Sequence, residues 1–143
     1  MSVSRTIFVG LAALLATASV SGTATAADPR ASAAAVVQMI EGVLHGCKSF
    51  DYLDEKAMLA TRPQFRGLAV VDIVALASDE GELWGVVFDG DVKTVAKAIP
   101  EASKKKKVRT KDHETPVDLG LDPGTTPGQT FLFCRWKNPN PMD

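Results

Sequence analysis

The sequence has few of the residues and motifs that most often carry enzyme chemistry. It contains two cysteines, two histidines, two tryptophans and one tyrosine among 143 residues. Cys47 and Cys134 lie far apart, so the chain has no C-x-x-C pair for thioredoxin-type redox chemistry and no C-x-x-C-H site for covalent haem. It also lacks a G-x-S-x-G nucleophile elbow and a phosphate-binding P-loop. We therefore expect no cofactor and consider a catalytic function less favoured than a binding function.

An excess of charge of one sign is also missing. The chain has 16 lysines and arginines against 17 aspartates and glutamates, which gives a formal net charge of −1. A protein near neutrality lacks the broad positive field that draws nucleic acid to a surface. Its one lysine run, residues 104–107, is not interleaved with aromatic side chains that could stack on bases. We therefore expect no nucleic-acid partner.

The first 26 residues show the three parts of a bacterial-type export signal. Arg5 precedes an uncharged, mainly apolar run over residues 7–20, and Ala24-Thr25-Ala26 fits the small-x-small cleavage rule. The alternative is an uncleaved anchor, but Ser, Gly and Thr dilute the second half of the segment below the apolar length that a spanning helix needs. We predict a signal peptide over residues 1–26, a periplasmic or secreted protein, and no stable membrane span after cleavage.

The two cysteines are predicted to form a disulfide. An oxidising compartment makes this the default for two cysteines in a small exported domain. Cys47 continues an apolar helical stripe, whereas Cys134 alternates with Leu132 and Trp136 as on one face of a strand. Both thiols should therefore point into the core, where a bridge would close a loop of about ninety residues. A buried free pair and a reactive thiol are the alternatives.

Hydrophobic periodicity indicates one α+β domain over residues 27–137, followed by a flexible tail over residues 138–143. The proline- and glycine-rich segment 115–129 is predicted to be a loop. We expect a small, mainly antiparallel sheet of three to four strands, a long N-terminal helix packed on one face, and a second short helix after the central hairpin. The main expected elements are a helix from Asp28 to about Cys47, strands over 68–77 and 83–88, a helix over 92–99 and a strand over 130–136.

The strongest charge cluster is Lys104-Lys105-Lys106-Lys107 with Arg109 and Lys111. Such a cluster can contact an acidic partner protein or an anionic component of the cell envelope. The same pattern is typical of a solvated edge strand, which lysines protect from unwanted pairing. The cluster is the sequence-based candidate for a binding surface.

Asp112-His113-Glu114 places a histidine between two carboxylates, which are the residue types of a general base or a metal site. Neighbouring residues of an extended chain point to opposite sides, so the three converge only in a loop, and a solvated connection is the alternative. His45 could assist this site. Its position near the end of the first helix also suits the helix dipole.

Three aspartates are further candidates for a metal site or a binding site. Asp89-Gly90-Asp91 resembles part of a calcium loop, but the other acidic positions and the final glutamate of an EF-hand are missing, and a turn with a helix N-cap explains both residues. We therefore predict no metal site. Asp72 interrupts an apolar strand, which indicates either a partly covered second face or a binding surface.

The sequence thus favours an exported, non-enzymatic domain that binds a protein or envelope partner, of the inhibitor, immunity or accessory type. The alternative is a small hydrolase or metal-dependent enzyme centred on His113 with Asp112 or Glu114. A third possibility is an envelope component that associates only with itself.

Overall fold

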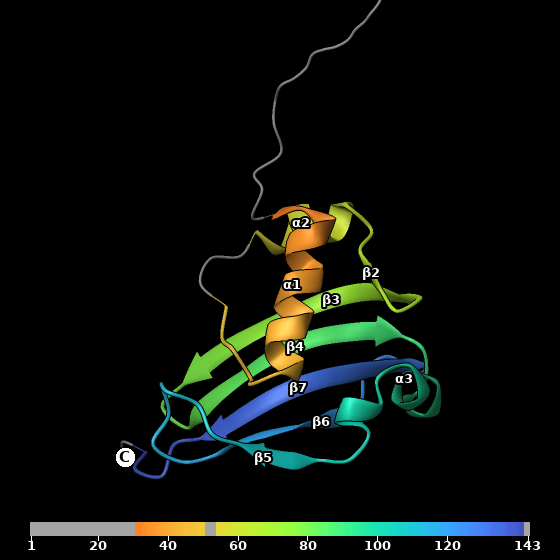
Figure 1. Ribbon diagram of the computed structural model, residues 1–143. Coiled ribbons are helices and arrows are strands. Elements are labelled where there is room, and N and C mark those ends of the chain that lie inside the picture. The colour runs from red at the N-terminus through yellow and green to blue at the C-terminus, as the bar shows by residue number, and fades with distance from the viewer. Residues whose placement is uncertain (1–30, 51–53, 142–143) are drawn as a thin grey trace, which may run out of the picture.

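The computed structural model describes residues 31–50 and 54–141 (Figure 1). The predicted signal peptide and the expected helix start at Asp28 lie outside the described residues. None of the described helices is long and apolar enough to cross a membrane. The helices are α1 (Ala33–Leu44), α2 (Glu55–Ala60), α3 (Val92–Ala98) and the 3-10 helix η4 (Pro100–Ala102). The strands are β2 (Gln64–Phe65), β3 (Leu68–Ser78), β4 (Gly81–Asp89), β5 (Lys106–Val108), β6 (Val117–Pro123) and β7 (Gln129–Lys137).

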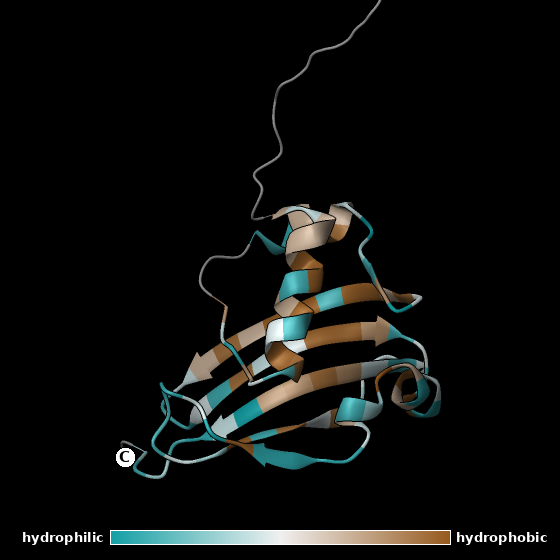
Figure 2. Ribbon diagram, viewed as in Figure 1, coloured by the Kyte–Doolittle hydropathy of each residue, from teal (hydrophilic) through white to brown (hydrophobic). Residues whose placement is uncertain are grey.

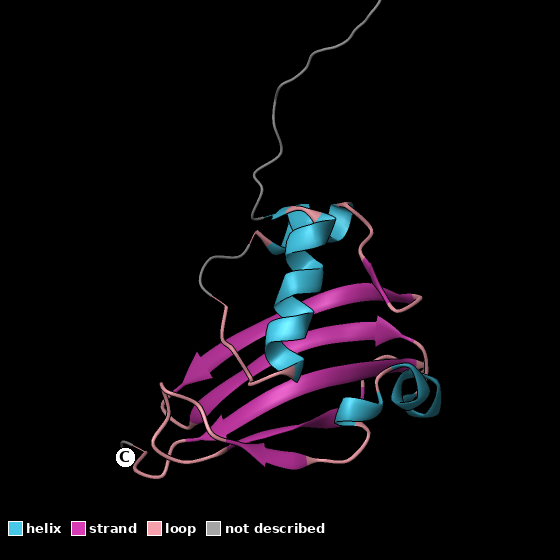
Figure 3. Ribbon diagram, viewed as in Figure 1, coloured by secondary structure: helices cyan, strands magenta, loops and turns pink. Residues whose placement is uncertain are grey.

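The strands form one curved, antiparallel six-stranded sheet in the order β2-β3-β4-β7-β6-β5. Figures 1 and 3 show α1 crossing in front of the sheet, with α3 at the far end of the same face. Buried residues of both helices, such as Ile40 and Val95, belong to one core cluster with Val86 and Leu132 of the sheet. We call this side the covered face and the opposite side the open face.

The expected sheet of three to four strands with a long N-terminal helix is wrong. The sheet has six strands, and α1 has 12 residues. Ser32 caps the start of α1, because its hydroxyl accepts a hydrogen bond from the backbone N–H of Ala35 at 3.1 Å. At the other end, Gly46 and Cys47 have φ values of +155° and +52°, which end the helix before the cysteine.

The larger sheet arises because the segment predicted as a loop contains β6. Its apolar residues Val117, Leu119 and Leu121 are buried on the covered face, and they alternate with Asp118 and Asp122 on the open face. Pairing with β7 on one side and β5 on the other supplies the hydrogen bonds that this short strand needs. The sequence-based prediction missed this alternation because the prolines and glycines of the segment indicate a loop.

A β-bulge in β3 accounts for Asp72. The register with β4 shifts between Val70 and Asp72, so Val70 and Ile73 both face the core although they are three residues apart. Asp72 therefore lies on the open face, where its Oδ1 accepts a hydrogen bond from the N–H of Ile73 at 2.8 Å. The carboxylate is exposed and needs no buried partner.

The predicted disulfide between Cys47 and Cys134 is present. It joins the turn after α1 to β7 across a sequence separation of 87, with the Cα atoms 5.9 Å apart. Both cysteines are buried beneath α1, where Figure 2 shows apolar bands on the sheet. The bond is compatible with a protein that works outside the cytoplasm.

Candidate functional site

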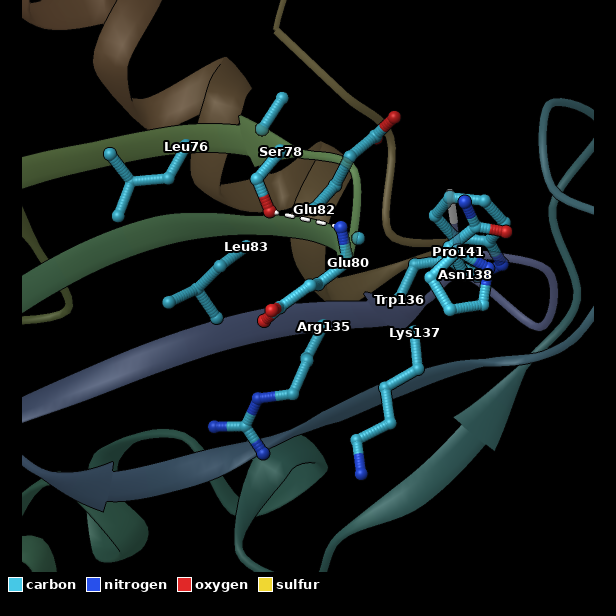
Figure 4. A pocket seen from close by; sticks show the side chains of 12 residues that line it. Leu76, Ser78, Glu80, Glu82, Leu83, Arg135, Trp136, Lys137, Asn138 and Pro141 are labelled. Carbon is cyan, nitrogen blue, oxygen red and sulfur yellow. Dashed lines mark hydrogen bonds between the residues drawn. The ribbon is translucent and has the colours of Figure 1, made fainter. Parts of the chain in front are cut away.

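Two hollows meet at the end of the sheet where β3 turns into β4. The outer groove has a volume of about 580 Å³ and is lined mainly by the β3–β4 turn, the end of β7 and residues that follow it (Figure 4). The inner pocket has a volume of about 340 Å³ and lies between the segment Ser49–Phe50 and the ends of β3 and β4. Leu76, Ala77 and Glu82 line both hollows.

Strand register assigns the side chains around these hollows to opposite faces. Leu76, Leu83 and Arg135 pair across β3, β4 and β7 and point to the open face. The neighbouring row of Ala77, Glu82 and Trp136 points to the covered face. Figure 4 shows the consequence, with the Glu82 side chain extending away from Leu83 and Arg135.

On the covered face, Glu82 contacts His113. The imidazole is stacked on Trp84 with ring centroids 5.5 Å apart, and Trp136 packs against it at 4.9 Å. Its Nε2 lies 3.0 Å from Oε1 of Glu82, and its Nδ1 lies 2.7 Å from the hydroxyl oxygen of Thr110. A carboxylate oxygen accepts, so Nε2–H donates to Glu82, and the Thr110 hydroxyl pairs with Nδ1.

The two tryptophans tie this cluster to the surrounding chain. The indole N–H of Trp84 donates to the carbonyl oxygen of Lys48 at 3.1 Å, which holds the segment after the disulfide against the sheet. The indole N–H of Trp136 donates to the hydroxyl of Thr115 at 2.9 Å. The histidine thus lies in a fixed cage of aromatic rings and hydrogen bonds.

This geometry does not favour the predicted catalytic group. The side chain of His113 is 4% exposed, and both ring nitrogens have partners. Asp112 and Glu114 are exposed, and the hydrogen bonds of the imidazole run to Thr110 and Glu82 instead. Among residues 31–50 and 54–141, no group of three or more histidine, cysteine or acidic side chains is arranged to hold a metal ion. His113 is placed to orient Glu82 rather than to reach a substrate.

Sequence reasoning missed Glu82 and Thr110 as members of this cluster. Glu82 alternates with Trp84 along β4, so a shared face for the carboxylate and the indole was detectable. The approach of His113 to that face was not, because it depends on how the loop between β5 and β6 folds over the sheet.

His45 does not join the cluster. It lies just after α1 with its side chain 62% exposed, and its Nε2 is 3.4 Å from a carboxylate oxygen of Glu41 one turn earlier. Asp91 caps α3 by accepting a hydrogen bond from the N–H of Thr94 at 2.8 Å, and this bond lowers the pKa of the Asp91 carboxyl. Asp89 is exposed at the end of β4.

The predicted basic cluster is partly neutralised by β6. Nζ of Lys105 lies 2.7 Å from Asp122, and Nζ of Lys107 lies 2.6 Å from Asp118. Arg135 approaches Asp122 at 3.7 Å. The remaining members are basic side chains that form no ion pair within the described part of the chain, namely Lys104, Lys106, Arg109 and Lys111.

Two of these basic side chains, Arg135 and Lys105, also cover part of the open face. Phe133 is fully buried there, with the Arg135 guanidinium 4.6 Å and the Lys105 ammonium 5.8 Å from its ring centroid. The other half, on β3 and β4, has no such cover from the described residues. Leu76 on that half is 63% exposed, and Val71, at the bulge of β3, is 37% exposed.

Comparison with known proteins finds no match for this chain among family models, curated proteins or solved structures. The two hollows and the open face are therefore interpreted from their own chemistry.

Proposed function

We propose that this protein is an exported, non-enzymatic domain that binds a protein partner through the β3–β4 half of the open face and the outer groove. The observation that carries the proposal is Leu76, a large apolar side chain that is 63% exposed beside Leu83 at the edge of the groove. A large apolar side chain exposed at the edge of a groove is a position that an apolar residue of a partner can cover.

The charges around the groove suggest the chemistry of that partner. Arg135 and Lys137 of β7 line the groove next to Leu83, and Figure 4 shows both side chains extending to the same side of the sheet. Lys137 forms no ion pair with the other described residues, whereas Arg135 also approaches Asp122, and the acidic residues that line the groove are Glu80 and Glu82. The β7 end of the groove therefore suits a carboxylate of the partner, beside an apolar anchor residue that packs on Leu76 and Leu83.

Two further observations support a binding function. His113, the chain's best candidate for a general base, is enclosed by two indoles and already hydrogen-bonded at both nitrogens. The cluster around it makes the end of the sheet rigid, and a rigid surface loses less conformational entropy on binding. Inhibitor, immunity and envelope-accessory proteins are examples of such binding domains.

The export signal expected in residues 1–26 and the Cys47–Cys134 disulfide support a periplasmic or secreted location for this activity. The same proposal therefore restricts the partner to proteins that meet the domain outside the cytoplasm.

The test is site-specific photo-crosslinking in the native periplasm. A photoreactive residue at Leu76 should capture one specific protein, whereas the same residue at Lys97, exposed on α3, should not. Leu76→Glu should abolish co-purification of that protein, because it adds a carboxylate to a surface that we expect to meet carboxylates. Lys97→Glu is the matched control and should leave it unchanged.

Equal capture at both positions, or none at Leu76, would show that this face is not the interface. Capture of a second copy of the chain, with a dimer in light scattering, would identify self-association instead. If the protein turns over a substrate, and the Leu76→Glu variant keeps this activity, the protein is an enzyme and the proposal is wrong.

A further inference from the structure

We infer that the inner pocket is a binding site for a small organic cation, an ammonium group on a short apolar stem. The proposal goes beyond the proposed function, because it concerns the covered side of the β3–β4 end and needs no partner protein. It follows from the pocket's composition, from the way Glu82 is held, and from the aromatic rings beside it.

The described lining of the inner pocket carries one ionisable group, which is a carboxyl group. Its volume of about 340 Å³ is in the range of small-ligand sites. Of the seven described residues that line it, Glu82 is the single ionisable one. A carboxylate among apolar walls attracts a cation, because few polar groups compete with the ligand for it. The other lining residues are small, apolar, aromatic or hydroxylated: Ser49, Phe50, Ala75, Leu76, Ala77 and Trp84.

The Glu82 carboxylate is held in place by His113. Oε1 of Glu82 accepts a hydrogen bond from Nε2 of His113 at 3.0 Å, and the histidine is itself fixed by Thr110 and two indoles. Within the described part of the chain, no hydrogen bond or ion pair uses Oε2 of Glu82. The side chain of Glu82 is 39% exposed, so this second oxygen is available to a ligand that enters from solvent.

The walls of the inner pocket combine small side chains with aromatic ones. Ala75 and Ala77 point to the covered face next to Trp84 and Glu82, and both are exposed among the described residues. Phe50 and Trp84 line the same space, and Trp84 is fixed through its bond to the carbonyl of Lys48. An apolar stem can rest on the alanines, with the ammonium between the carboxylate and an aromatic face.

The test uses the protein's own fluorescence. The chain's two tryptophans both contact His113, so ligand binding beside Glu82 should change their emission. We would titrate the exported, disulfide-bonded protein with n-pentylammonium chloride and, at matched ionic strength, with the neutral n-pentanol and the anionic pentanoate. Saturable binding is expected for the cation, and at least tenfold weaker binding for the other two.

Two variants and a control locate the site. Glu82→Gln keeps a hydrogen-bond acceptor for His113 but removes the charge, and should weaken binding of the cation at least tenfold. Phe50→Leu keeps an apolar wall without the aromatic ring, and should weaken it about threefold while leaving n-pentanol unchanged. Glu55→Gln, exposed on α2 and outside both hollows, should have no effect.

A capped tripeptide with a central lysine serves as a second ligand. Binding of the peptide with equal affinity would assign the site to a lysine side chain of a macromolecule, whereas binding of the free amine alone would assign it to a small metabolite. Equal binding of n-pentanol and n-pentylammonium, or a folded Glu82→Gln variant with unchanged affinity, would overturn the proposal. If Glu82→Gln does not fold, the neutral ligand and Phe50→Leu decide the question.

Discussion

Oε1 of Glu82 lies 3.0 Å from Nε2 of His113, although the two residues are 31 positions apart in the sequence. This contact joins the start of β4 to the loop between β5 and β6, and it lies between two tryptophans. It makes the histidine a structural and positioning group and leaves the carboxylate facing two hollows.

Replacing His113 with alanine should destabilise the protein. The change leaves a cavity between the Trp84 and Trp136 indoles and removes a partner from Glu82 and Thr110, at a cost of about 2–4 kcal/mol in the free energy of unfolding. Urea unfolding followed by circular dichroism measures this change in the free energy of unfolding. His45→Ala is the matched control, and with its side chain 62% exposed it should shift stability by less than about 0.5 kcal/mol. Equal effects of the two changes would contradict the enclosed position of His113.

Removing the disulfide should lower stability substantially. In the chain-entropy model, a bridge across 87 residues stabilises a fold by about 4–5 kcal/mol, and measured values are often smaller. We expect the Cys47→Ala, Cys134→Ala double variant to lose about 2–5 kcal/mol in urea unfolding. Reductant should destabilise the wild-type protein and leave the double variant unchanged. An unaffected wild-type protein, with both thiols accessible to alkylation, would show that the bridge does not form.

The ion pair between Arg66 and Glu101 should make stability depend on pH. Two hydrogen bonds of 2.7 Å join the groups, and those from the Arg66 guanidinium lower the pKa of Glu101 from 4.5 to about 2. The carboxyl pKa is lower in the folded state, so its stabilisation is complete above about pH 4.5 and is lost as the pH falls towards 2.

Glu101→Gln should therefore destabilise the protein by about 1 kcal/mol at pH 7, because both side chains are about one-third exposed and solvent screens the pair. The difference between wild type and variant should narrow as urea unfolding is repeated from pH 4.5 to pH 3. A difference that stays constant over this range would mean that the pair does not form.

Alanine at Gly85 should be far more damaging than alanine at Gly67. Gly85 has φ +153° in the middle of β4, and an added Cβ would collide with the backbone carbonyl of Leu132 on β7. Rigid backbone cannot move aside cheaply, so we expect a loss of about 3 kcal/mol or more. Gly67 has φ +81° in an open turn, and Gly67→Ala should cost about 1 kcal/mol. Thermal melts of both variants test the contrast.

Short-range patterns predicted the parts of the fold that depend on a few neighbouring residues. The alternation around Cys134 correctly indicated a buried strand position, and the cap at Asp91 was read from its place before a helix. The same patterns failed for β6, where Pro116, Pro123-Gly124 and Pro127-Gly128 outweighed the alternation of Val117, Leu119 and Leu121. The strand over 68–77 was predicted correctly, but its alternation did not reveal the bulge that puts Val70 and Ile73 on one face and Asp72 on the other.

The candidate sites were harder to predict than the strands. The lysine run was visible as charge, but its pairing with Asp118 and Asp122 depends on β5 lying beside β6. Exposure of Leu76 could not be predicted, because an apolar residue on a strand is buried or exposed according to what packs on that face.

The sequence by itself determined the disulfide partners, since only two cysteines are present and both follow buried patterns. Tertiary structure alone decided which face of the sheet α1 covers and that His113 meets Glu82 rather than Asp112 or Glu114. The reason is that periodicity reports which residues of one element share a side, whereas strand order and loop path set which elements meet.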